Sequence, residues 1–407
     1  MTRPNAANAE RPKEAKLERR DWMWLPILSV LTICLLAGSV EWYARRVFAR
    51  LPTAGENCLV VNDPSDGARG IPNCVVRGKI PEGQVMEYRF NSSGYRDNAD
   101  FGPKSADTYR IVMVGTSVAA GFRVPQEQTV AALLPADLSQ RTGRKVEVYN
   151  QGLPLQTTNS IARHLNDAIA ANPDMILWIV SPLDISYSAM AERRDAVGRR
   201  EGANPRNPEA GDWSSIKAVF ATESFQTSMA TIFSHTRTAI LLKDLLYESP
   251  SQYVQAALMG ADYKKEFLQS GSSAEWLREL KEFDSSAADI EGQARKAGIP
   301  LVAVLVPDRT QAAMISMMDE CPKGFDPYKL GRELRSIIVS HGGTYVDILP
   351  QFRTVPNPQL GYFAIDGHPN AYGQAMIARF LTNQLAGLPI PAMSAAAQPQ
   401  AGLQPRQ

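Results

Sequence analysis

The chain has 407 residues, enough for one large domain or two ordinary ones with a buried core. Its 43 lysines and arginines against 42 aspartates and glutamates give a net charge of +1, and 44% of the residues are hydrophobic. With no basic stripe interleaved with aromatic residues, this composition argues against nucleic acid as a partner and is typical of a globular protein.

The first structured segment predicted along the chain is an uncharged run of 19 residues, 22–40. At about 1.5 Å per residue it nearly spans the roughly 30 Å hydrocarbon core of a bilayer. Aromatic residues flank the run, and six basic residues precede it where three follow closely. We therefore expect a cytoplasmic segment 1–21, a single-pass anchor 22–43 in a bacterial inner membrane, and a periplasmic body. A cleaved signal peptide and a buried core helix are the alternatives.

Residues 44–107 are predicted to be a loop-rich lead-in with one isolated strand at 84–90. Within it, Cys58 and Cys74 flank a Gly-, Pro- and Asp-rich loop. In an oxidising compartment a disulfide between them would stabilise the fold by roughly 3 kcal/mol, and free thiols are the alternative. Cys34 lies inside the predicted span and Cys321 is left over. No metal site is expected, because no histidine or second cysteine pair has ligand spacing.

From residue 108 onward, short apolar runs alternate with helical patterns. Continuous runs rich in Val, Ile and Leu indicate strands buried on both faces, at 111–114, 146–149, 175–180, 301–306 and 345–349. Helical patterns fall between them, one ending near Gly143 and another near Gly298. This alternation predicts an α/β fold over 108–386, with a doubly wound, flavodoxin-like parallel sheet of five strands.

Two segments depart from this alternation. The interval 185–297 is too long for one crossover, and apolar residues between 216 and 233 recur at helical spacing. We expect a helical insertion that serves as a lid, as a docking surface for a partner, or simply as packing. The tail 387–407 is rich in Ala, Pro and Gln and is predicted to be disordered.

Candidate catalytic residues lie at both ends of the predicted domain. Ser117 follows the first strand in the block Gly-Thr-Ser-Val-Ala-Ala-Gly, and is expected to open a helix at the carboxyl edge of the sheet, where ligands bind. An N-capping serine is the alternative. His368 precedes the last predicted helix, 371–385, and Asp366 lies two residues before it. Such an aspartate can orient an imidazole as a general base. The other histidines, His164, His235 and His341, are expected to be structural.

The order of these blocks resembles that of the SGNH/GDSL hydrolase family, over about 95–385 without the insertion. Gly115, Ser117 and Gly121 match its nucleophile block, Asn150-Gln151-Gly152 its glycine block, and Asp366 with His368 its final block; the lead-in 91–96 is also similar to that of membrane-anchored bacterial members. The resemblance implies a serine esterase or acyltransferase without a cofactor. It also implies that the backbone N–H groups of Ser117 and Gly152 stabilise the oxyanion.

Several positions depart from the family pattern. Thr116 replaces the usual aspartate, and Leu183, next to Asp184, replaces the asparagine that donates to the oxyanion. A missing oxyanion donor costs about 10²–10³ in rate. The short Asp-x-His spacing resembles that of polysaccharide acetyltransferase-like branches, which implies O-acetyl groups of an envelope or secreted polysaccharide as substrate. The alternative is a non-catalytic glycan-binding or scaffolding subunit in an envelope protein complex.

Overall fold

The computed structural model describes residues 19–51, 57–61, 67–185, 236–259, 266–317 and 320–388. Most of the predicted cytoplasmic segment, nearly all of the predicted disordered tail, and the helical patterns between 216 and 233 lie outside these residues. His235 also lies outside them.

The centre of the domain is the predicted parallel sheet of five strands, in the order β6-β5-β7-β8-β9. Its strands are β5 (Thr108–Gly115), β6 (Lys145–Asn150), β7 (Met175–Val180), β8 (Leu301–Leu305) and β9 (Thr344–Val346). Every residue of β5, β7 and β8 is buried, as their continuous apolar runs require. The last strand is shorter than predicted, because the chain turns into helix α12 (Leu349–Phe352).

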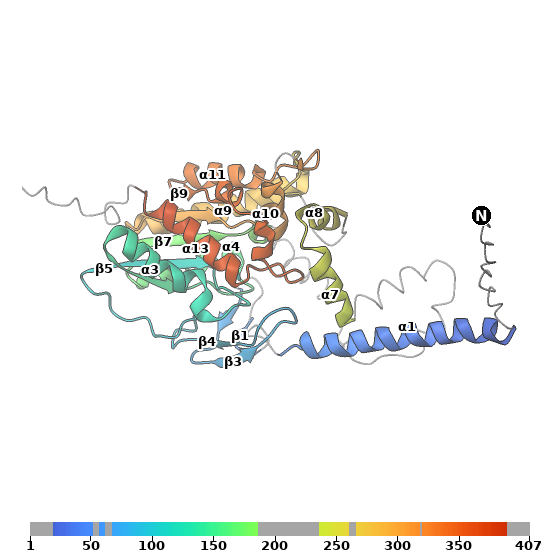
Figure 1. Ribbon diagram of the computed structural model, residues 1–407. Helices are drawn as coiled ribbons and strands as arrows, with labels where there is room; N and C mark the ends of the chain where they lie inside the picture. Colours follow the sequence, from blue (N-terminus) through green and yellow to red (C-terminus); the bar gives the residue numbers. More distant parts are fainter. Residues whose placement is uncertain are drawn as a thin grey trace, which may run out of the picture.

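Helices cover both faces of this sheet (Figure 1). They are α3 (Val130–Thr142), α4 (Thr158–Ala170), α9 (Ala274–Lys296), α10 (Arg309–Ser316), α11 (Lys329–Ser340) and α13 (Ala371–Leu385). Helix α3 packs on α13, and α4 packs on α9. Right-handed crossovers put α3 and α4 on opposite faces, because the strand order reverses at β5, and α13 shares the face of α3 on which it packs. Gly143 ends α3 in the left-handed conformation, as predicted.

The insertion is shorter than the predicted interval 185–297. Helix α9 belongs to the core, because its Trp276, Phe283 and Ile290 are buried against the sheet domain. Between β7 and α9 the described part of the insertion consists of α7 (Arg237–Leu246) and α8 (Pro250–Met259).

The described part of the lead-in, 44–51, 57–61 and 67–107, is paired and packed against the body rather than forming a loop-rich linker. It contains two antiparallel pairs, β1 (Leu59–Val60) with β2 (Arg69–Gly70), and β3 (Val75–Gly78) with β4 (Met86–Arg89). The strand predicted as isolated is therefore paired. Tyr88 of β4 and Phe90, which directly follows this strand, are buried in one cluster with Phe122 and Leu153 of the sheet domain. The cluster fixes the lead-in to the residues that follow Ser117.

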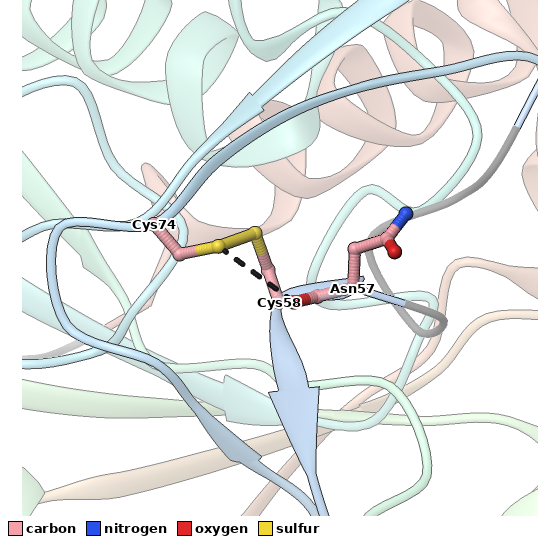
Figure 2. The surroundings of a disulfide bond; sticks show 3 residues. All are labelled: Asn57, Cys58 and Cys74. Carbon is pink, nitrogen blue, oxygen red and sulfur yellow. Dashed lines mark hydrogen bonds between the residues drawn. A yellow bond between two sulfur atoms is a disulfide. The ribbon is translucent and has the colours of Figure 1, made fainter.

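The predicted disulfide between Cys58 and Cys74 is confirmed, with the two Cα atoms 5.7 Å apart (Figure 2). It joins the start of β1 to the start of β3 across a sequence separation of 16 residues. Cys58 is fully buried in the cluster that holds Tyr88. Cys34 and Cys321 are free.

Replacing both Cys58 and Cys74 by serine is expected to lower the free energy of unfolding by about 3 kcal/mol, because the unfolded chain regains the entropy of an open loop. Chemical denaturation of the full chain, followed by tryptophan fluorescence, measures this loss. The matched control replaces the free pair, Cys34 and Cys321, by serine. If both double variants unfold at the same denaturant concentration, the disulfide does not stabilise the fold.

One long apolar helix, α1 (Arg19–Val47), precedes the body. In the described part of the chain it alone is long and apolar enough to cross a membrane, over Trp24–Val47. Its carboxyl end is fixed to the lead-in, because Lys79 Nζ donates to the carbonyl oxygens of Val47 and Ala49 at 3.0 and 3.1 Å.

Candidate active site

Ser117 lies in the turn that follows β5, at the carboxyl edge of the sheet. The predicted helix does not begin there. Residues 117–123 form consecutive turns, in which Phe122 N–H bonds to Ser117 O and Gly121 N–H to Val118 O. Left-handed φ angles of 60° at Gly121 and 81° at Arg123 prevent a helix from continuing. The serine is therefore presented by a tight turn.

Gly115 brings this turn against the neighbouring strand. A Cβ at this position would lie 2.5 Å from the carbonyl oxygen of Ile179 in β7 and 2.7 Å from Ala119 Cβ. Gly115 also has a φ of 149°, which L side chains rarely adopt. Any side chain here would displace the turn that carries Ser117.

The three predicted catalytic side chains meet, although 251 residues separate Ser117 from His368. His368 Nε2 lies 2.8 Å from Ser117 Oγ, and His368 Nδ1 lies 2.5 Å from Asp366 Oδ1. With Asp366 accepting from Nδ1–H, Nε2 is the nitrogen that faces the hydroxyl with its lone pair. The geometry is that of a nucleophile, a general base and the carboxylate that orients the base.

Two further charged residues hold Asp366, and sequence analysis identified neither. Arg123 Nε donates to Asp366 Oδ2 at 3.0 Å, and the carboxylate of Glu82 accepts from the backbone N–H of Asp366 at 2.6 Å. Burial alone would raise the pKa of Asp366, but the hydrogen bond and charge of His368 and the charge of Arg123 lower it below the ordinary 3.8. The carboxylate therefore stays ionised beside the imidazole.

A buried arginine fixes the turn from behind. Arg96, only 2% exposed, donates to the backbone carbonyls of Ala120, Gly121 and Val124, and lies 4.4 Å from the ring centre of Tyr88. The Tyr88 hydroxyl in turn accepts from Arg123 N–H at 3.0 Å. The only signal in the sequence was the 91–96 block that resembles membrane-anchored family members, and it gave Arg96 no role.

Thr116, which departs from the family pattern, belongs to a buried hydrogen-bonded unit with Asp184. Thr116 Oγ1 donates to Asp184 Oδ1, and Ser181 N–H donates to Asp184 Oδ2, both at 2.7 Å. Asp184 is 6% exposed. This unit joins the residue before Ser117 to the segment that follows β7, so it positions Ser117 from a second side.

Replacing Asp184 by asparagine is expected to change how stability depends on pH. Burial raises the pKa of Asp184 from 3.8 to about 6, against the opposing hydrogen bonds from Thr116 and Ser181. A carboxyl with a raised folded-state pKa favours folding below its unfolded pKa, and this contribution is lost as the pH rises through about 6. The wild type should therefore lose stability relative to Asp184→Asn between about pH 4 and about pH 7.

Urea unfolding at a series of pH values measures this difference. Asp137→Asn, at an exposed position on α3, is the control. If the curves for wild type and Asp184→Asn stay parallel across that range, the carboxyl does not titrate there.

The predicted oxyanion donors differ in their surroundings. Gly152 N–H donates to Asn150 Oδ1 at 2.9 Å, so it already has an acceptor. In the described part of the chain, the Ser117 N–H has no hydrogen-bond acceptor. Leu183 is 46% exposed and has no polar side-chain atom to donate. The oxyanion role of Ser117 and Gly152 stays a prediction.

A cavity of about 390 Å³ opens beside His368. One wall comes from the sheet domain, with Val118, Leu183, Tyr362 and Ile365. The other comes from the insertion, with Lys243, Tyr247 and Tyr253, among others. Its size and largely apolar walls suit a small organic ligand. The described helices of the insertion thus contribute directly to the site. Among the described residues, no group of three or more His, Cys, Asp or Glu side chains is placed to hold a metal ion.

Comparison with known proteins gives a likeness of fold. No family model matches the sequence, and no curated protein matches it. The chain is similar to a lipase/acylhydrolase from Enterococcus faecalis, with 13% identity and a TM-score of 0.34 over 69% of this chain and 96% of that one. A member of the lipolytic G-D-S-L family from Veillonella parvula has 12% identity and a TM-score of 0.35, over 69% and 100% of the two chains.

A third similar structure is the psychrotrophic esterase EstA from Pseudoalteromonas, with 10% identity and a TM-score of 0.31 over 68% of this chain and 96% of that one. Identities and TM-scores this low do not identify a reaction. What the site does chemically is therefore inferred from its own geometry.

Proposed function

We propose that this protein is an acyl-ester hydrolase or acyltransferase that uses Ser117 as its nucleophile. The observation that carries the proposal is the continuous hydrogen-bond line from Ser117 Oγ through the imidazole of His368 to Asp366, with steps of 2.8 and 2.5 Å. A half-buried serine in such a line, beside a cavity, is arranged for covalent catalysis.

In the proposed reaction His368 Nε2 takes the proton of Ser117, and Oγ attacks the carbonyl carbon of the ester. The tetrahedral intermediate collapses, the bond to the leaving alcohol breaks, and His368 returns the proton to that alcohol. An acyl-serine remains. A water or a sugar hydroxyl then attacks its carbonyl carbon while His368 removes the proton. The bond from the acyl group to Ser117 Oγ breaks and His368 returns the proton to Oγ, which frees the acid after hydrolysis or the new ester after transfer. Asp366 stabilises the imidazolium in both halves, and no cofactor takes part.

We further propose that the substrate carries O-acetyl groups on an envelope or secreted polysaccharide. The proposed periplasmic position supports this, because an anchored body outside the inner membrane meets such polymers. The short spacing between Asp366 and His368 and its resemblance to acetyltransferase-like branches support it as well. The cavity, at about 390 Å³, is large enough for an acetyl group with part of a sugar.

The test is hydrolysis of p-nitrophenyl acetate by the full chain in nanodiscs, beside Ser117→Ala and His368→Ala. In both variants kcat should fall by about 10⁴–10⁶-fold, because the serine and the histidine act as one unit and removing either one abolishes the contribution of the other. Ser340→Ala and His341→Ala are matched controls, since these neighbours lie on the far end of α11. Turnover unchanged in Ser117→Ala would refute the serine mechanism.

The second candidate function is a non-catalytic glycan-binding or scaffolding subunit, and Leu183 favours it, because this side chain cannot donate to an oxyanion. An acetylated polysaccharide added to the same assay distinguishes the two. Release of acetate indicates a hydrolase, and acetylation of an added acceptor glycan indicates a transferase. Glycan binding that is equal in wild type and Ser117→Ala, with no turnover in either assay, would support the scaffold.

A further inference from the structure

Helix α7 of the insertion is fixed to the apolar helix α1. The carboxylate of Glu41 accepts from the backbone N–H groups of Arg237 and Thr238 at 3.1 and 2.9 Å, and from Thr238 Oγ1 at 2.8 Å. These N–H groups belong to the first turn of α7, which has no intrahelical acceptors for them. A residue of α1 thus caps a helix that follows it by almost two hundred positions.

The position of Glu41 in α1 determines where along α1 the first turn of α7 lies. Glu41 immediately precedes Trp42 and Tyr43, which are 63% and 59% exposed, and Arg45 and Arg46 follow them. Exposed aromatic and basic residues at the end of an apolar helix are typical of the region where a bilayer meets water. Figure 1 shows α7 leaving α1 near its carboxyl end and running across its axis rather than along it. Helix α7 therefore extends sideways at this level.

The two sides of α7 face different surroundings. Lys243, together with Tyr247 just after the helix, lines the cavity beside His368. Leu242, Leu245 and Leu246 are 40%, 58% and 56% exposed. Their spacing of three and four residues places them in one stripe along the helix.

We propose that this leucine stripe, Leu242, Leu245 and Leu246, lies in the interfacial layer of the bilayer that α1 crosses, which holds the catalytic cavity at the membrane surface. The inference rests on the proposal that α1 is a retained anchor. Lipid is the occupant that fits, because the stripe lies on a helix whose first turn is capped by α1, and the apolar 18-residue window of α1 has none of its residues buried against protein. A helix with an apolar side and a polar side lies in this layer with its apolar side toward the acyl chains.

The test places one spin label at a time on the full chain in nanodiscs. Leu242, Leu245 and Leu246 are each replaced by cysteine in a Cys34→Ser, Cys321→Ser background that keeps the disulfide. Native Cys34, labelled with only Cys321 replaced, is the reference for lipid. Leu277→Cys is the aqueous control, because Leu277 is a 56% exposed leucine on α9. Melting temperatures confirm that each labelled protein is folded. Because three stripe positions are labelled, the test does not depend on the folding of any one variant.

The measured quantity is the ratio of collision rates with oxygen and with a water-soluble nickel chelate. We expect a several-fold higher ratio at the stripe than at Leu277→Cys, in the direction of Cys34. Stripe labels that resemble Leu277→Cys while Cys34 is in lipid would overturn the inference and leave the anchor intact. Immobile labels shielded from both reagents would show protein cover and also overturn it. A Cys34 label open to nickel would overturn both the anchor and the inference, without bearing on Ser117.

Discussion

Asp366→Asn is expected to lower kcat/KM for p-nitrophenyl acetate by about 10³–10⁴-fold. Arg123 Nε donates to one oxygen of Asp366 at 3.0 Å, so an asparagine would direct its carbonyl oxygen toward Arg123. Its NH₂ group would then face His368 Nδ1 and donate a hydrogen bond to it. Nδ1 would have to be the unprotonated nitrogen. The imidazole would have to carry its proton on Nε2, which faces Ser117 Oγ at 2.8 Å and would no longer accept the hydroxyl proton.

Steady-state kinetics of the full chain measure this loss. Asp284→Asn is the matched control, because Asp284 pairs with His341 at 2.7 Å in a second His–Asp pair, between α9 and the end of α11. It should leave kcat/KM unchanged. Activity of Asp366→Asn within a few-fold of wild type would mean that this carboxylate does not set the tautomer of His368.

Arg96→Met is expected to lower the free energy of unfolding by about 3–5 kcal/mol, since buried backbone carbonyls lose their charged donor at roughly 1–3 kcal/mol each. The guanidinium donates to three backbone carbonyls of the turn, and methionine would remove this donor from all three. Gly121 O would keep the N–H of Val124, at 3.4 Å. Burial lowers the pKa of Arg96 to about 10, so the guanidinium is still charged at neutral pH. Because the same turn presents Ser117, kcat should fall as well.

Chemical denaturation and the esterase assay measure both effects of Arg96→Met. Arg89→Met is the control within the lead-in, since the Arg89 side chain is 49% exposed and pairs with Glu87 on the surface of β4. A change below about 1 kcal/mol is expected there. If Arg96→Met is no less stable than Arg89→Met, the three carbonyls find other donors and the turn does not depend on Arg96.

The sequence alone determined the sheet, its strand count and the helix that ends at Leu385. Continuous apolar runs mark the strands and helical spacing of apolar residues marks the helix, and both patterns are local properties of the sequence. It also picked out Ser117, Asp366 and His368. Asp366 and His368 are near neighbours in the chain, and Ser117 directly follows a buried strand. The Cys58–Cys74 disulfide was one of two alternatives that the sequence left open, and the structure chose between them.

Only the tertiary structure decided what surrounds those three residues. Glu82, Arg96 and Arg123 act through contacts between distant segments, and an isolated arginine or glutamate in a loop has no period or spacing that marks it. The prediction of a helix at Ser117 was wrong for a related reason. The buried Arg96 stabilises consecutive turns by donating to their carbonyls, and local helix propensity does not include this distant contact. The capping of α7 by Glu41 is likewise a long-range contact, and it joins the apolar helix to the wall of the cavity beside His368.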